Sequence, residues 1–170
     1  QRAESARLQV AFWPLLTGRV RAVVDVSGPG LSLSGMLARG GGEVRITGLA
    51  GDIAAWRLPG AADLGLSGPD GVVFSLDEAV FDEEAGCVSA AGVLRSDLLV
   101  SAGARYQTEL PALSGVFTCA GPRLAVEASG ESPVVALDGR ALMGASAAEW
   151  SVQARGDARE IAIVMIALGF

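Results

Sequence analysis

The segment from residue 72 to residue 130 constrains the fold most, because its apolar runs are short and are interrupted by glycine, proline and acidic turns. Turn residues recur at roughly 8–12-residue intervals, a spacing typical of the antiparallel strands of an all-β protein. The same rhythm continues over almost the whole chain. The segment also contains both cysteines of the sequence, Cys87 and Cys119.

Alternation between apolar and polar residues predicts where the individual strands lie. In residues 19–26, for example, apolar side chains occupy the even positions and Arg19, Arg21 and Asp25 occupy odd ones. The predicted strands cover residues 8–13, 19–26, 31–39, 43–47, 61–67, 72–81, 87–94, 98–103, 113–119, 123–128, 134–137 and 149–154.

Three features depart from this alternation. Gly35 indicates a bulge or a close approach between strands. Asp52 is placed to cap one helical turn that would put Ile53 and Trp56 on the same side. Residues 157–168 begin with the helix-start pattern Asp-Ala-Arg-Glu and continue as an apolar run, which predicts a helix too short to cross a bilayer. We therefore predict a mainly β fold in a single domain over residues 1–170: an antiparallel meander sheet with one short C-terminal helix.

The two cysteines allow two interpretations. A disulfide between Cys87 and Cys119 would close a loop and stabilise the fold by about 3–4 kcal/mol. Two buried, reduced thiols are the alternative. Both residues lie in strand-like segments close to glycines (Gly86 and Gly121), a setting compatible with neighbouring strands. We expect the disulfide, which indicates an oxidising compartment.

Composition excludes several classes of function. The net charge is −6, and the 13 basic residues are all arginines scattered along the chain, which argues against nucleic-acid binding. There is no histidine, so His-based catalytic triads and His-ligated metals are excluded. We expect no enzyme activity, no cofactor and no metal site.

One cluster of carboxylates and the large aromatic residues are candidate sites. The carboxylate cluster comprises Asp77, Glu78, Asp82, Glu83 and Glu84. Paired carboxylates can cleave glycosidic bonds and clustered ones can bind Ca²⁺, but the order of these residues lacks the alternating ligands of a calcium loop. A solvated hairpin turn is the better interpretation. The aromatic residues are interpreted as core anchors, with the lining of a ligand site as the alternative; they are Trp13, Trp56, Phe74, Phe81, Phe117 and Trp150.

The chain begins at Gln1 within a polar segment, and no apolar run approaches the ~20 residues of a membrane span. We expect it to be a secreted or periplasmic part of a longer protein whose targeting or anchoring segment precedes Gln1.

Residues 8–20 (LQVAFWPLLTGRV), residues 42–51 (GEVRITGLAG) and residues 86–94 (GCVSAAGVL) provide a more specific indication. The first is a strand that ends in tryptophan and is followed by Leu-Leu-x-Gly-Arg-Val. The second is a Gly-x-Val strand with a break, and the third a cysteine followed by a Gly-Val strand. Together they resemble landmarks of the type II secretion system protein N family, also called general secretion pathway protein N. Cys119 lies about where that family places the second cysteine.

The resemblance implies a function as well as a fold. Members of the family have one N-terminal membrane helix and a periplasmic domain, and they are accessory components on the inner-membrane side of the machine that exports folded proteins across the outer membrane. The implied fold is a long, curved antiparallel sheet with an apolar concave face. No catalytic residues are implied, and the expected partners are other inner-membrane or outer-membrane components of the secretion system.

The sequence and the resemblance together leave three candidate functions. The first is a non-catalytic scaffold of the secretion system, which acts through its sheet edges and one face. The second is a periplasmic lipid-handling groove, which would need a continuous apolar lining open to solvent. The third is an ordinary sandwich module of an extracellular protein.

Overall fold

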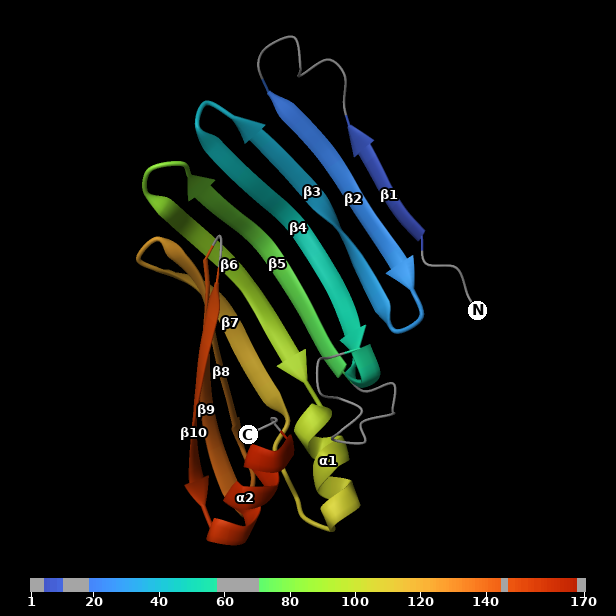
Figure 1. Ribbon diagram of the computed structural model, residues 1–170, viewed down its shortest axis with the longest axis vertical. Coiled ribbons are helices and arrows are strands. Elements are labelled where there is room, and N and C mark those ends of the chain that lie inside the picture. The colour runs from blue at the N-terminus through green and yellow to red at the C-terminus, as the bar shows by residue number, and fades with distance from the viewer. Residues whose placement is uncertain (1–4, 11–18, 58–70, 145–146, 168–170) are drawn as a thin grey trace.

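The structure, a computed structural model, describes residues 5–10, 19–57, 71–144 and 147–167. Ten strands in this part of the chain form one antiparallel sheet in which each strand lies beside its neighbour in sequence, from β1 to β10 (Figure 1). The strands are β1 (Ser5–Val10), β2 (Val20–Gly28), β3 (Leu31–Gly40), β4 (Glu43–Ala54), β5 (Gly71–Asp82), β6 (Gly86–Ser96), β7 (Leu113–Ala120), β8 (Arg123–Glu131), β9 (Val135–Met143) and β10 (Ala148–Gly156). The predicted meander is confirmed.

Three helical segments accompany the sheet within the described residues. A short 3₁₀ helix, η2 (Ala55–Arg57), follows β4; α1 (Leu98–Tyr106) follows β6; and α2 (Ala158–Ala167) follows β10. The predicted C-terminal helix is thus present, directly after Asp157. No helix among the described residues is long and apolar enough to cross a membrane. The predicted strand over residues 61–67, and Trp13, lie outside the described residues.

Two predictions of local structure are wrong. Residues 98–103 form the start of α1 instead of a strand, because Leu99 and Ala102 lie three residues apart on one helical face and are both buried. Asp52 does not cap a helical turn: β4 continues through it, and the Ser32 hydroxyl donates a hydrogen bond to its carboxylate from the neighbouring strand.

The register of β3 and β4 explains how the sheet accommodates the irregularity predicted at Gly35. Pairing shifts between Ser34 and Met36, and a Cβ on Gly35 would lie 2.9 Å from the Leu49 Cα. On the opposite strand Gly48 has φ +58°, a left-handed conformation that favours glycine. The predicted bulge is therefore confirmed, and both glycines are required by it.

The two faces of the sheet differ in chemistry. Side chains that share a face can be followed from strand to strand through the printed register. We call one face the inner face; its representative residues are Val24, Leu33, Ile46, Phe74, Phe117, Val126, Ala141 and Val152. The outer face is mainly polar; it includes Arg21, Asp25, Ser34, Arg45, Glu78, Arg95, Glu127, Arg140 and Gln153.

The sheet curves toward the inner face. The rings of Phe74 on β5 and Phe117 on β7 lie 6.4 Å apart between centroids, although β6 separates these strands. Gly92 on β6 makes this approach possible, because a Cβ there would lie 3.2 Å from the Phe117 ring. A sheet whose non-neighbouring strands touch on one side is concave on that side, so the sheet forms a trough.

Two apolar clusters fill part of the trough. The first lies where α1 and α2 pack against the inner face at one end of the sheet (lower end in Figure 1), and its buried members are Leu99, Leu110, Val135, Leu137, Ile163 and Val164. The second lies in the curve of the sheet around Leu76, Ala79, Phe117 and Val126. The core is thus the inner face itself, which the described helices α1 and α2 cover at one end.

The aromatic residues divide between the core and the surface. Phe74, Phe81 and Phe117 belong to the second cluster, as predicted. The prediction of a core position is wrong for Trp56 and Trp150, which are 44% and 55% exposed. Trp56 packs instead over the β2–β3 turn, where a Cβ on Gly30 would lie 2.5 Å from its ring.

Candidate interaction surfaces

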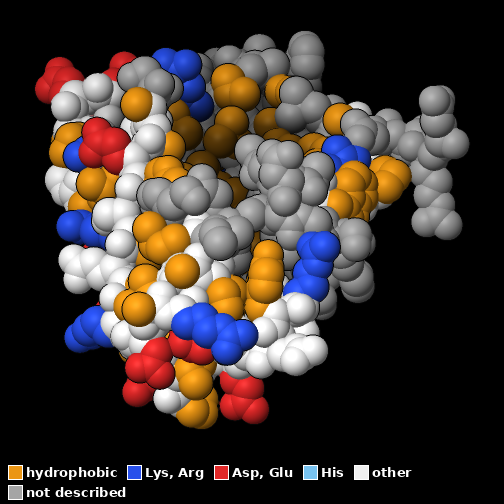
Figure 2. Space-filling model, turned by 60° about the horizontal axis from the view of Figure 1, so that its bottom comes forward, with side chains coloured by type: hydrophobic (Ala, Val, Ile, Leu, Met, Phe, Trp, Pro, Cys, Tyr) orange, Lys and Arg blue, Asp and Glu red, His pale blue; other side chains and the backbone are white. Residues whose placement is uncertain are grey.

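The inner face beyond the second cluster is the first candidate surface. Across β2, β3 and β4 it presents aliphatic side chains, most of them partly exposed; they include Val24, Val26, Leu31, Leu33, Leu37 and Val44. Helices α1 and α2 pack elsewhere on the sheet, and η2 contacts the β2–β3 turn at the margin of this surface through Trp56. Figure 2, seen from the helix end, shows hydrophobic side chains lining a hollow. An apolar surface of this kind is suited to bind another apolar surface.

The two edges of the sheet are the second candidate surface. Within the described residues β1 pairs only with β2, and β10 pairs only with β9. One side of each edge strand therefore carries backbone N–H and C=O groups that no strand of this sheet occupies. Such an edge can add a further strand from a partner.

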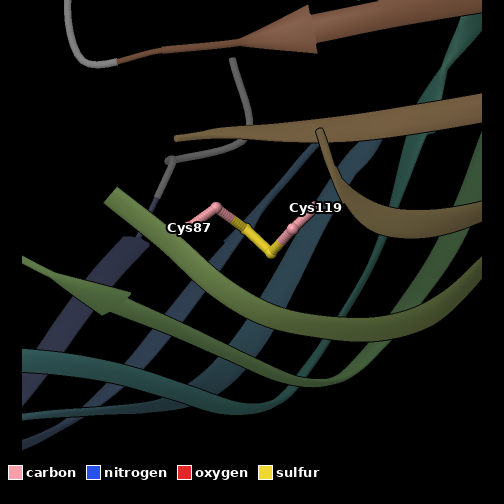
Figure 3. The surroundings of a disulfide bond; sticks show 2 residues. All are labelled: Cys87 and Cys119. Carbon is pink, nitrogen blue, oxygen red and sulfur yellow. A yellow bond between two sulfur atoms is a disulfide. The ribbon is translucent and has the colours of Figure 1, made fainter. Parts of the chain in front are cut away.

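A disulfide joins Cys87 on β6 to Cys119 on β7, and their Cα atoms are 5.6 Å apart (Figure 3). The paired register of β6 and β7 extends only from Gly92 to Ser96 on β6. Beyond it, the disulfide and a hydrogen bond from the Cys87 N–H to the Pro122 carbonyl (2.9 Å) join the other ends of the two strands. The covalent bond thus lies where ladder hydrogen bonding has stopped.

The contact between Gly86 and Pro122 supports this end of the strands. Gly86 has φ +76°, and a Cβ there would lie 2.4 Å from the Pro122 carbonyl oxygen. We expect Gly86→Ala to lower the free energy of unfolding by at least about 2 kcal/mol, because the left-handed backbone is strained with a side chain and the Cys87–Pro122 hydrogen bond is displaced. Chemical denaturation measures the change.

Gly121 provides the matched control. It also has a positive φ (+58°), but nothing lies within 4 Å of its Cβ position. Gly121→Ala should therefore cost about 1 kcal/mol from backbone strain alone. Equal losses in the two variants would show that the Pro122 contact contributes nothing.

Several carboxylates of the cluster form hydrogen bonds or ion pairs at or near the β5–β6 hairpin. Asp82 accepts hydrogen bonds from the backbone N–H groups of Glu84 and Ala85, both at 2.9 Å, and these bonds lower the pKa of its carboxyl group. Glu83 forms an ion pair with Arg39 (2.6 Å), and Glu78 forms one with Arg45. Asp77 is exposed. Among the described residues, no group of metal-ligating side chains lies together closely enough to hold an ion.

The outer face contains a hollow of about 840 Å³ over β6 to β10. Its lining mixes charges of both signs, and Glu127 and Arg140 in it form an ion pair at 3.4 Å. Exposed ion pairs of this kind contribute little to stability and leave no single sign of charge to attract a ligand. The inner face and the edges are therefore the stronger candidates.

Helix α1, one of the two helices that pack against the inner face, was not predicted from the sequence. A signal was available: Asp97 precedes Leu98, and the sequence LLVSAGARY contains two alanines and an arginine, which are good helix formers. The apolar run Leu98–Val100 masked this signal, because a short apolar run fits a buried strand equally well.

Comparison with known proteins identifies the family of the chain. A family model described as type II secretion system (T2SS), protein N, matches residues 2–165. Searches of curated proteins and of solved structures found no match. The family match spans nearly the whole chain, including every described strand and most of α2. The chain therefore belongs to the type II secretion system protein N family and is a component of that secretion machinery.

Proposed function

We propose that the chain is a non-catalytic scaffold of the secretion system: a single periplasmic domain, anchored to the inner membrane through a segment outside residues 1–170, that binds other inner-membrane or outer-membrane components. The observation that carries the proposal is the trough, an apolar inner face that the described helices cover only at one end. The disulfide supports the periplasmic location, since such bonds persist in oxidising compartments.

Leu37 marks the accessible part of the inner face. It is 36% exposed, and its neighbours on the same face are Ala22 on β2 and Ile46 on β4. Burying an aliphatic side chain of this size contributes about 1.5–3 kcal/mol. A few such contacts along β2 to β4 would give a partner protein appreciable affinity without any charged anchor.

A lipid-handling groove is the second candidate, and the same apolar lining favours it. It would need a continuous open channel, whereas the second cluster fills the trough between β5 and β9 with packed side chains. Because packed side chains fill this half of the trough, the scaffold function is better supported than the lipid-handling groove. Native mass spectrometry of the purified protein separates the two, because a co-purifying lipid would favour the groove.

The decisive experiment places a charge on the inner face. We expect Leu37→Glu to abolish binding to other secretion components and to reduce export of the system's substrates at least tenfold, because a carboxylate cannot be buried against an apolar partner without a large cost. Affinity capture of the full-length protein from membranes, followed by mass spectrometry of the captured secretion components, measures binding.

Met36 provides the control on the adjacent residue. It is 45% exposed, but it lies on the outer face beside Val23 and Thr47. Met36→Glu should leave both capture and export unchanged. If the two variants behave alike while both stay folded by circular dichroism, the inner face is not the binding surface.

A further inference from the structure

The free edge of β10 has features that suit one specific partner. In Figure 1 no described element lies beside this edge, and α2 turns from the end of β10 toward the inside of the sheet. The strand has nine residues without proline, and its register with β9 runs from Ala148 to Gly156 without a shift. Natural proteins protect edge strands by short length, charged side chains, proline, bulges or a covering element, and β10 has neither proline nor a bulge.

The hairpin that joins β9 to β10 fixes which backbone groups point outward. The Gly144 N–H donates to the Ala147 carbonyl (2.9 Å), so residues 144 and 147 form a hydrogen-bonded pair. Antiparallel ladders alternate between hydrogen-bonded and non-hydrogen-bonded pairs. The odd-numbered residues of β10 therefore bond to β9, and Val152 and Ala154 direct their N–H and C=O groups to the free edge.

The side chains of β10 are complementary to the same strand reversed. Glu149 and Arg155 lie three residues to either side of Val152, and both project from the outer face. We propose that β10 pairs with β10 of a second copy of this chain, antiparallel and two-fold symmetric about Val152, so that Glu149 faces Arg155 of the partner subunit. Two sheets would then continue as one.

This register forms the pair between Glu149 and Arg155 twice, once on each side of the two-fold axis. Glu149 and Arg155 would form a non-hydrogen-bonded pair, the type in which side chains approach most closely. Each already has one partner in its own sheet, Arg123 at 2.9 Å and Asp138 at 2.5 Å. Their side chains nevertheless remain 66% and 75% exposed, so each has donors or acceptors for a second partner.

Neighbouring registers lack this complementarity. Centring the pair on Ser151 places Glu149 opposite Gln153, and centring it on Gln153 places Glu149 opposite Asp157, a like charge. The edge strand β1 offers no alternative with a second copy, because its only charged residue is Arg7. The charges therefore select one register on one edge.

The inner face fits the same register. Trp150, 55% exposed, would lie opposite the small side chain of Ala154 in the partner subunit, and Val152 would lie opposite its own copy. Ala154 packs against the cluster of α1 and α2. The partner's Trp150 would thus extend that cluster across the interface, which gives a large aromatic side chain a site to bury.

A cysteine at the symmetry axis tests the register directly in the full-length protein. We expect Val152→Cys to form a disulfide-linked dimer when membranes are oxidised with copper phenanthroline, because the two copies would have Cα atoms about 5.5 Å apart. The native cysteines are already bonded to each other, and wild-type protein measures the background.

Ala148→Cys is the matched control on the same edge. In the proposed register its two copies are separated by eight residues of strand, about 27 Å, and cannot be linked. Selective linking of Val152→Cys supports the proposal. Absence of that link, or equal linking of both variants, overturns it.

Charge reversal tests the ion pairs. Glu149→Arg and Arg155→Glu alone should each weaken dimerisation of the full-length protein tenfold or more, because each creates two like-charge pairs. The double variant restores both pairs across the interface, so it should dimerise more tightly than either single variant, as measured by analytical ultracentrifugation; recovery is incomplete because the new charges face Arg123 and Asp138 of their own sheet. Failure of the double variant to recover overturns the pairing. The inference does not depend on the proposed scaffold function, since Leu37→Glu leaves β10 intact.

Discussion

Leu99→Ala is expected to lower the free energy of unfolding by about 2–5 kcal/mol. Leu99 is 1% exposed and is one of the two largest fully buried side chains among the described residues. It lies on α1 and packs in the cluster that joins this helix to α2 and β9. Truncation would leave a cavity at the centre of a cluster shared by α1, α2 and β9, so we expect the loss to lie in the upper part of this range.

Urea denaturation followed by circular dichroism measures the change. Val100→Ala on the same helix is the control: Val100 is 43% exposed, so its truncation should change stability by no more than about 0.5 kcal/mol. A loss below about 1 kcal/mol for Leu99→Ala would mean that α1 does not hold the sheet in the way described.

Replacing both cysteines, Cys87→Ala with Cys119→Ala, is expected to lower the free energy of unfolding by about 3–4 kcal/mol. The bond closes a loop of 32 residues in sequence separation, and its removal increases the conformational freedom of the unfolded chain. The loss should be concentrated near the ends of β6 and β7, where the ladder is already interrupted. Hydrogen exchange of the Cys87 N–H region would locate it.

Reduction gives an independent measurement of the same bond. Dithiothreitol should destabilise the wild-type protein by a similar amount and should not affect the double variant. Sensitivity of the double variant to the reductant would contradict this explanation, because no other cysteine is present in the sequence.

The sequence predicted the sheet because each strand is marked by its own residues. Alternation identifies a half-buried strand, and Gly28-Pro29-Gly30 or Gly40-Gly41-Gly42 identifies the turn that follows. Strand order then follows from the short connections, since consecutive antiparallel strands joined by tight turns must be neighbours. The meander could therefore be predicted from the residues alone, without comparison to known proteins.

The errors arose where tertiary contacts outweigh local signals. The apolar residues of α1 resemble a strand when read alone, and only packing against α2 and β9 selects the helix. Trp56 and Trp150 were placed in the core because of their size, yet each lies at the margin of the sheet. Burial of an aromatic residue depends on its position in the sheet, and the residue type alone does not predict that position.

The function could not be predicted from residue chemistry, since an apolar surface carries no reactive groups. The resemblance of residues 8–20, 42–51 and 86–94 to the secretion family supplied it, and the family match over residues 2–165 confirmed the membership. The trough and the free edge of β10 depend on register, and register becomes visible only in the three-dimensional structure.

The sequential strand order has a consequence for how the protein is made. Each strand pairs with the one that was synthesised immediately before it, so the chain can fold from its N-terminus as it emerges, hairpin after hairpin. Among the described elements, α2 must return to meet a helix that formed about fifty residues earlier, as estimated from the spacing of the two helices. Packing of α2 is thus expected to be the final event, and until then the apolar residues at the helix end of the inner face stay accessible to chaperones.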